Sequence, residues 1–233
     1  KYPIIMAPMF LVTNTKMMIE AMNSGIAGCI PALNYRNDNL FREAIQEIRA
    51  NTSSKGLGIN LIVNKSNIKM QQQLKTCVEL EVDFIITSLG SPKQVIEQCK
   101  PKGIKVFCDV VEEKYAVKVE RLGADAVIAV NSKAGGHAGK LLPEEIIPLL
   151  NKHCSIPVIS AGGIGTKDGI DKIMNLGAAG LSIGSPFIAC EEAHISEEYK
   201  NACVDYGKED IVFTTKISGT PCTVINTPYV QQT

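Results

Sequence analysis

The chain has 233 residues, 45% of them hydrophobic and 21% charged, and its 24 basic side chains balance 24 acidic ones. A net charge of zero argues against broad electrostatic binding, so we expect a small-molecule ligand and no nucleic-acid or membrane partner. The length suits one α/β barrel better than two small domains and is enough to bury a large core.

The eight cysteines are scattered, without a CxxC pair or the spacing of zinc ligands. Most occupy apolar helix or strand patterns, where cysteine behaves as a small hydrophobic residue. We therefore expect reduced thiols, no bound metal and a cytoplasmic location. We recognise no signal peptide and no long apolar run. The chain begins with Lys1 and not with Met, which leaves open whether native residues precede it.

Short apolar runs alternate with amphipathic helical patterns along the chain. The runs predict strands at 2–6, 26–31, 56–62, 82–87, 104–108, 126–130, 156–160 and 179–183. The segments between and after them predict helices at 15–24, 38–49, 68–80, 92–102, 113–122, 143–152, 166–176 and 196–206. Strands without polar alternation are typical of a parallel sheet buried on both faces.

Eight such units most simply close into a TIM (β/α)8 barrel, with a doubly wound open sheet as the alternative. We expect a single domain in which residues 1–213 form the barrel. Residues 214–233 would form a short C-terminal extension that packs on it. The sequence leaves the oligomeric state open, with a homodimer as one option.

In a TIM barrel, the residues that follow the strands meet at one face, where ligands bind. Polar or glycine residues follow nearly every expected strand: Ala7-Pro8-Met9, Pro31, Asn60, Thr87-Ser88, Asp109, Asn131-Ser132, Ala161-Gly162-Gly163 and Gly184-Ser185. The last two groups would be neighbours and would offer bare backbone N–H groups beside the helix that begins near Thr166. This pattern predicts a phosphate-bearing ligand. The alternative is that these glycines only permit tight turns.

The loop at 131–139 follows the sixth expected strand and holds Gly135, Gly136 and Gly139 around His137. Glycine lets a loop approach a ligand closely because it has no Cβ. Histidine is the side chain in this loop that can move a proton near neutral pH. We therefore take His137 as the candidate catalytic residue, against the simpler interpretation of an exposed turn.

Six segments carry a family resemblance that spans nearly the whole chain. They are PIIMAPM (3–9), GINL (58–61), GADAVIAVNSKAGGHAGKL (123–141), PVISAGGI (157–164), GAAGLSIGSPF (177–187) and SGTPCTVINTPYV (218–230). In this order they resemble the nitronate monooxygenases, formerly called 2-nitropropane dioxygenases. They are also similar to the FMN-dependent enoyl-ACP reductases of type II, which share the barrel.

The resemblance implies an FMN cofactor and assigns residues to it. The backbone of Ala7, Pro8 and Met9 would lie against the flavin ring, and Asn60 would hydrogen-bond the ring or the ribityl chain. Gly162, Gly163, Gly184 and Ser185 would hold the phosphate, with Ser132 and Ala161 also at the cofactor. Gly135 and Gly136 would let the loop approach the flavin, and His137 would sit over its reactive face.

Several positions depart from the family pattern. Many members have Gln-Gly-Gly-Met where this chain has Met6-Ala7-Pro8-Met9, and Thr-Arg where it has Ser185-Pro186. The lysine that some members carry after the fifth strand is replaced here by Cys108 or Asp109. Relatives often continue with a long C-terminal segment, whereas little follows Val230. These departures leave the substrate open.

The resemblance favours FMN-dependent oxidation of alkyl nitronates with O2. Reduction of an enoyl thioester, with NAD(P)H as the electron donor and acyl carrier protein as a partner, is the alternative within the same fold. A flavin-free barrel acting on a sugar phosphate as an isomerase or lyase, and a non-catalytic flavin-binding protein, are alternatives of other classes.

Overall fold

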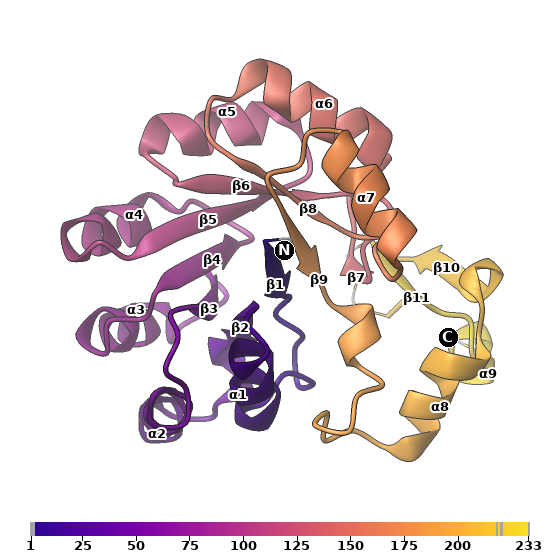
Figure 1. The fold of residues 1–233 in the computed structure, drawn as a ribbon, viewed down its shortest axis with the longest axis horizontal. Coiled ribbons are helices and arrows are strands. Elements are labelled where there is room, and N and C mark those ends of the chain that lie inside the picture. The colour runs from indigo at the N-terminus through magenta and orange to yellow at the C-terminus, as the bar shows by residue number, and fades with distance from the viewer. Residues whose placement is uncertain (1–2, 218, 220, 233) are drawn as a thin grey trace.

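The computed structural model describes residues 3–217, 219 and 221–232, so the expected segments 214–233 and 218–230 are described only in part. Eight parallel strands close into a barrel, which confirms the expected TIM fold (Figure 1). In order around the barrel they are β1 (Ile4–Met6), β2 (Ala27–Pro31), β3 (Leu57–Ile62), β4 (Phe84–Ser88), β5 (Lys105–Val110), β6 (Ala126–Val130), β8 (Val158–Ala161) and β9 (Gly180–Ile183). Pairing of β1 with β9 closes the ring.

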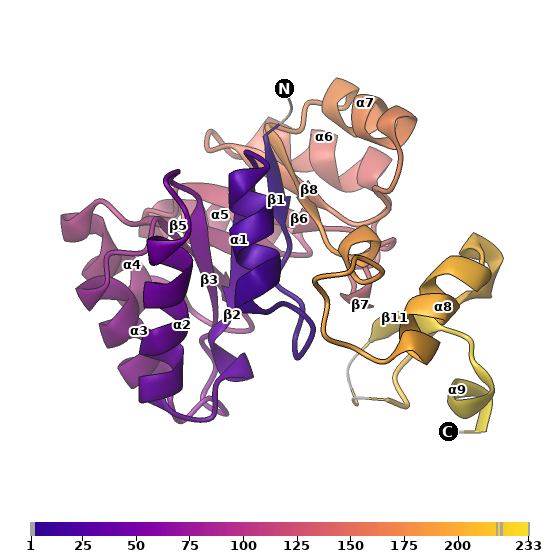
Figure 2. The same cartoon turned by 60° about the horizontal axis from the view of Figure 1, so that its bottom comes forward.

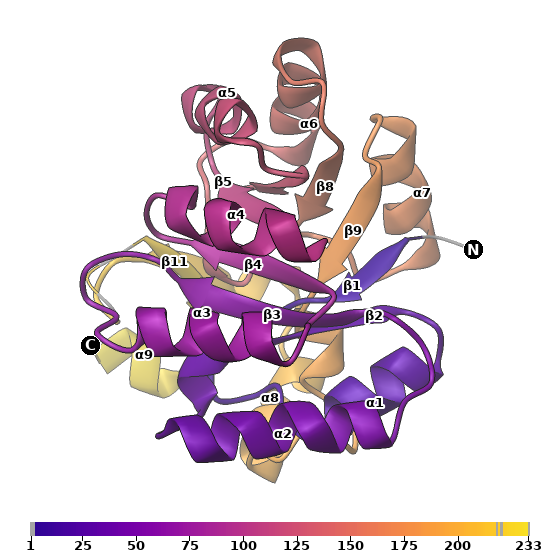
Figure 3. The ribbon, with the colours of Figure 1, turned by 90° about the vertical axis from the view of Figure 1, so that its left-hand side faces the viewer.

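Helices connect the strands and cover the barrel from outside. They are α1 (Thr15–Asn23), α2 (Asp38–Ala50), α3 (Met70–Glu79), α4 (Lys93–Cys99), α5 (Glu113–Leu122), α6 (Pro143–His153) and α7 (Lys167–Asn175). Figure 3 shows α2, α3 and α4 side by side over the outer face of the strands. Among the described residues, no helix has the length and apolar character needed to cross a membrane.

The helix ends follow the capping signals of the sequence. Asn14, Asn37 and Thr166 each accept a hydrogen bond from the backbone N–H three residues further along, at the starts of α1, α2 and α7. Gly123 ends α5 in the left-handed conformation that glycine adopts without strain. Side-chain caps of this kind typically stabilise a helix by about 1 kcal/mol each.

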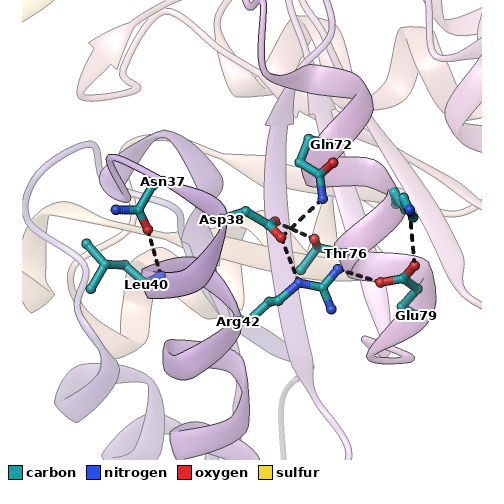
Figure 4. Close-up of polar contacts among 8 residues, drawn as sticks. Asn37, Asp38, Leu40, Arg42, Gln72, Thr76 and Glu79 are labelled. Atoms are coloured by element: carbon teal, nitrogen blue, oxygen red, sulfur yellow. Dashed lines mark hydrogen bonds and ion pairs between the residues drawn. The ribbon is translucent and has the colours of Figure 1, made fainter.

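A polar cluster joins α2 to α3 on the outside of the barrel (Figure 4). Asp38, in the first turn of α2, accepts hydrogen bonds from Arg42, from Thr76 at 2.5 Å and from Gln72 at 3.1 Å. Arg42 also pairs with Glu79 at the end of α3. The cluster fixes how these two helices pack, on the side of the strands away from the barrel interior.

The interior of the barrel is a small apolar core of its own. Its buried members are Ile5, Cys29, Phe84, Ile86, Ala126, Ile128 and Ile159. The Phe84 ring stacks on Phe107 with 5.2 Å between ring centroids. A Cβ at Gly58 would lie 2.2 Å from the Phe84 ring, so the aromatic ring requires a glycine on β3. This packing fills the barrel and leaves its carboxyl end as the place for a ligand.

The part after β9 forms a second small structure beside the barrel. It contains α8 (Glu197–Asp205), β10 (Ile211–Thr214), β11 (Cys222–Ile225) and α9 (Pro228–Gln232). Figures 1 and 2 show these elements gathered on one side, next to β7 (Gly136–His137). β10, β11 and β7 form an antiparallel sheet. Neither α8 nor α9 has a buried residue, so these two helices pack less closely than the helices that cover the barrel.

Two features of this region differ from the sequence expectation. The segment 131–139, expected to be a loop, contains the short strand β7. β10 begins at Ile211 and crosses the expected boundary between 213 and 214. β7 forms by pairing with β11, more than 70 residues further along the chain, and β10 forms by antiparallel pairing with the nearby β11. Local periodicity reveals neither pairing. The division into barrel and extension stays a prediction.

Candidate functional site

The carboxyl ends of β8, β9 and β1 lie together, as the strand order requires. Ala161 of β8 is in register with Ser182 of β9. The N–H of Ala7 donates to the Ile183 carbonyl at 2.7 Å, so the segment after β1 starts against the end of β9. A Cβ at Gly184 would lie 3.6 Å from the Ala7 Cβ and 3.7 Å from the Met9 side chain. The structure therefore brings three groups of expected site residues together.

Gly162 and Gly163 form the turn after β8, and both have positive φ, 114° and 72°. A Cβ on Gly162 would lie 2.5 Å from the Ala134 nitrogen and from Asn131 Oδ1. A Cβ on Gly163 would lie 2.9 Å from the Lys133 side chain. The loop after β6 thus packs directly on this turn, which explains both glycines in part without any ligand. Sequence reasoning missed this contact and the position of Lys133 over Gly163.

The same turn carries backbone donors that the protein does not use. Within the described residues, the N–H groups of Gly163, Ile164 and Gly165 donate no hydrogen bond, and neither do those of Gly184 and Ser185. A Cβ on Gly165 would lie 3.9 Å from the Pro186 ring, so the two sets of donors are on touching loops. Helix α7 begins just after the first set and directs its positive dipole end toward it. Unused N–H groups beside a helix N-terminus fit a phosphate group.

The loop after β6 reaches over this region. A Cβ on Gly135 would lie 2.9 Å from Ser185 Oγ, which places the loop in contact with the end of β9. Gly136 has φ 72° with open space around it. Asn131 is fully buried. Its side-chain nitrogen donates a hydrogen bond to the Gly162 carbonyl at 3.1 Å, and its side-chain oxygen accepts one from the Lys133 N–H at 2.8 Å. Ser132 donates its N–H to the Leu141 carbonyl and so closes the base of the loop.

His137 lies in β7 and is exposed. It is in register with Cys222 of β11, and Thr223 of the same strand donates its hydroxyl hydrogen to the Ala134 carbonyl. The imidazole forms no hydrogen bond or ion pair with the described residues. The C-terminal strand β11 therefore holds the backbone of the candidate catalytic loop. No local pattern in the sequence predicts this pairing.

Asn60 belongs to a chain of hydrogen bonds across the ends of three neighbouring strands. Its amide nitrogen donates to the Ile86 carbonyl at 3.2 Å and to Ser88 Oγ at 2.8 Å, and Ser88 donates to Asp109 Oδ2 at 2.5 Å. Burial raises the pKa of Asp109 to about 6, and the hydrogen bond from Ser88 offsets only part of this effect. Both hydrogens of the Asn60 side-chain nitrogen are thus used in hydrogen bonds within the protein, and Oδ1 is the atom that can bind a ligand.

The segment after β1 adds apolar surface to the same end of the barrel. Met9 donates its N–H to Thr13 Oγ1 at 2.9 Å, and Asn34 accepts from Leu11 at 2.9 Å and donates to the Thr13 carbonyl at 2.8 Å. Phe10 and Leu11 remain 62% and 67% exposed, and Leu11 has a φ of 59°. A non-glycine residue held in this conformation is uncommon, and here the two bonds to Asn34 fix it.

These features define a TIM-barrel protein whose candidate site lies at the carboxyl ends of the strands. The nitronate monooxygenase family model matches residues 1–233. The chain belongs to this family and is an oxidoreductase.

Individual relatives agree with this assignment. A probable nitronate monooxygenase from Staphylococcus haemolyticus is 28% identical over 276 aligned positions, covering 99% of this chain and 77% of that protein. The structure of FabK from Thermotoga maritima is 31% identical with a TM-score of 0.92, and the match covers 99% of this chain and 73% of that one. A nitroalkane oxidase from Streptomyces ansochromogenes shares the fold, with 19% identity and a TM-score of 0.89. The match covers 100% of this chain and 79% of that one.

The alignment with the Staphylococcus haemolyticus protein is longer than this chain. It runs over 276 positions, whereas the chain has 233 residues, so the relative carries residues inside the matched region that this chain lacks. The barrel strands and the loops of the candidate site are present despite these gaps.

Proposed function

We propose that the protein binds FMN at the carboxyl end of the barrel and oxidises alkyl nitronates with O2. The observation that supports this most directly is the set of unused backbone N–H groups on the touching loops 163–165 and 184–185. Their spacing along two adjacent strand ends suits the phosphate of a mononucleotide. FMN, when bound, supplies the chemistry of accepting electrons from the substrate and passing them to oxygen.

The remaining site residues would bind and orient the cofactor. Ala161, Gly162, Gly163, Gly184 and Ser185 would surround the phosphate. Ser132, Gly135 and Gly136 would approach the cofactor from the loop after β6. The segment Ala7-Pro8-Met9 offers the apolar surface on which a flavin ring would rest. Asn60 would accept a hydrogen bond through Oδ1.

We propose that His137 hydrogen-bonds the nitronate oxygens of the substrate or removes a proton from a neutral nitroalkane. It lies on a loop that β11 holds in place, and its imidazole is exposed and has no partner among the described residues. His137→Ala should retain FMN and lower turnover per bound FMN by about 10²–10⁴-fold. His137→Asn should recover part of this loss if hydrogen bonding is the main contribution. Unchanged turnover per bound FMN in the alanine variant would remove His137 from the site.

The similarity to FabK supports a second candidate function. The enzyme could instead take electrons from NAD(P)H and reduce an enoyl thioester carried by acyl carrier protein. Anaerobic mixing separates the two functions. Ethylnitronate should bleach the flavin of a nitronate monooxygenase, whereas NAD(P)H should bleach that of a reductase. We expect bleaching by ethylnitronate.

The phosphate site is tested with a pair of matched glycine variants. Gly163 and Gly103 have nearly equal φ, 72° and 70°, but Gly103 lies before β5 at the other end of the barrel with open space around it. A valine therefore introduces similar backbone strain at both positions. Gly163→Val should weaken FMN binding by at least about 10-fold, the loss of roughly one or two hydrogen bonds. Gly103→Val should bind like the wild type, and equal FMN affinity in the two variants would contradict the assigned site.

A further inference from the structure

Lys133 lies beside the expected phosphate site but has no role among the residues assigned above. It is an exposed residue of the loop after β6. A Cβ on Gly163 would lie 2.9 Å from both Cβ and Cδ of Lys133, so the apolar part of this side chain lies across Gly163. The ammonium group is two bonds beyond Cδ. It therefore stays close to the turn 163–165, whose backbone N–H groups donate no hydrogen bond among the described residues.

A buried amide fixes the backbone of Lys133 against this turn. Asn131 is fully buried, and its Oδ1 accepts a hydrogen bond from the Lys133 N–H at 2.8 Å. Its Nδ2 donates to the Gly162 carbonyl at 3.1 Å. One side chain thus ties the base of the lysine to the turn after β8. Because this arrangement needs no ligand, a contact from Lys133 costs less conformational entropy than one from a mobile loop.

The charge of Lys133 is available to a ligand, whereas two lysines on the neighbouring helix α7 are paired. Lys167 pairs with Asp171 at 2.5 Å, and Lys172 pairs with Glu144 at 2.5 Å. The hydrogen bond from Lys172 is the main cause of the lowered pKa of Glu144, and the charge of Lys133 adds to this effect. Lys133 itself forms no ion pair within the part of the chain that the structure describes. The region therefore carries one positive charge in excess.

A phosphate group needs more charge than the turn alone can offer. A phosphate monoester carries a charge of about −1.5 to −2 at neutral pH. Backbone N–H groups carry only partial charges, and a helix N-terminus is equivalent to roughly half an elementary charge. A full positive charge beside the turn 163–165 would compensate most of the remainder. Riboflavin has the same ring and ribityl chain as FMN but no phosphate, so it would gain nothing from this charge.

We propose that Lys133 provides the cationic contact to the cofactor phosphate and makes the site selective for FMN over riboflavin. The inference rests on the proposed function, because it starts from the FMN site. Lys133 acts on binding and takes no part in the transfer of electrons or protons. Since the contact is electrostatic, the affinity for FMN should fall as the salt concentration rises.

The experiment measures dissociation constants of FMN and riboflavin for the chain freed of flavin, through the quenching of flavin fluorescence. Lys133→Met keeps a long apolar side chain to pack on Gly163 but removes the charge. It should weaken FMN binding by about 10–100-fold and leave the affinity for riboflavin within about twofold of wild type. Lys133→Arg should retain most of the preference for FMN. Lys102→Met, an exposed position before β5 at the other end of the barrel, is the matched control for loss of one positive charge.

The salt dependence is a second readout that a merely structural role would not change. Between about 0.02 and 0.5 M salt, the FMN affinity of wild type should fall more steeply than that of Lys133→Met. Equal FMN affinity of Lys133→Met and Lys102→Met, or equal losses of FMN and riboflavin in Lys133→Met, would overturn the inference. A wild type that prefers FMN through Lys133 but whose bound flavin does not oxidise ethylnitronate would contradict the proposed function and retain the phosphate contact.

Discussion

Replacing Asp109 by asparagine should stabilise the fold above pH 6, because no cation among the described residues pairs with the wild-type carboxylate at the barrel mouth. Its pKa is raised by burial from 3.8 to about 6. Between these values the native state binds a proton that the unfolded state has released, so stability falls as pH rises through this window. Asparagine has no charge to bury, and its amide oxygen can still accept the hydrogen bond from Ser88.

The magnitude follows from the shift. A tenfold change in an ionisation constant corresponds to about 1.4 kcal/mol, so the native carboxylate costs on the order of 3 kcal/mol at pH 7. Asp109→Asn should recover up to this amount at pH 7 and almost none at pH 4.

Asp83 is the matched control for this measurement. Burial pushes the pKa of Asp83 upward, but the hydrogen bonds from Arg49 and from the Gly56 and Leu57 N–H groups outweigh it and hold the pKa below its ordinary value. The stability that the ionised Asp83 contributes is therefore lost as pH falls, and Asp83→Asn should destabilise the protein most at neutral pH. Urea unfolding of both variants at pH 4, 5, 6, 7 and 8 gives the comparison. If the free energy of unfolding of Asp109→Asn ran parallel to that of the wild type at all pH values, the Asp109 carboxylate would not destabilise the native state.

Three further outcomes follow from the packing and from the thiols. Gly58→Ala should lower the free energy of unfolding by at least about 2 kcal/mol, since its Cβ would meet the Phe84 ring, and Phe84→Leu in the same chain should recover part of the loss. Gly162→Ala should lower the free energy of unfolding by about 3 kcal/mol or more, because φ is 114° there and the new Cβ would lie 2.5 Å from the Ala134 nitrogen. Urea unfolding measures the change in both glycine variants. Thiol titration of denatured protein without reductant should find all eight cysteines reactive, as the structure has them, and six or fewer in fresh protein would contradict this.

The barrel could be predicted because each strand and helix carries its own signal. The run at 126–130 is apolar throughout, and that at 57–62 is apolar except for Asn60, as is typical of strands buried on both faces. Their parallel order follows from the helices between them. The ends of elements were predicted less well. The helix expected at 68–80 spans Met70–Glu79, since terminal residues lack the tertiary contacts that decide where a helix begins.

The site was predictable only where one residue type has one physical consequence. The glycines after β8 were expected to hold a phosphate, with a tight turn as the alternative. The structure has a turn there with positive φ at Gly162 and Gly163. The pairing of β7 with β11 could not be predicted, because neither segment is long enough to show a periodic pattern. The bond from Ser88 to Asp109 depends on the stagger of neighbouring strands, which only the closed barrel fixes.

The central claim is that this barrel binds FMN and uses it to oxidise nitronates. The most direct measurement mixes the FMN-loaded protein with ethylnitronate without oxygen and follows the visible absorption of the flavin, with NAD(P)H in a parallel experiment. Bleaching by ethylnitronate, and return of the colour when oxygen is admitted, is the predicted result. A protein that binds no added FMN, or a bound flavin that ethylnitronate leaves unchanged, would contradict the claim.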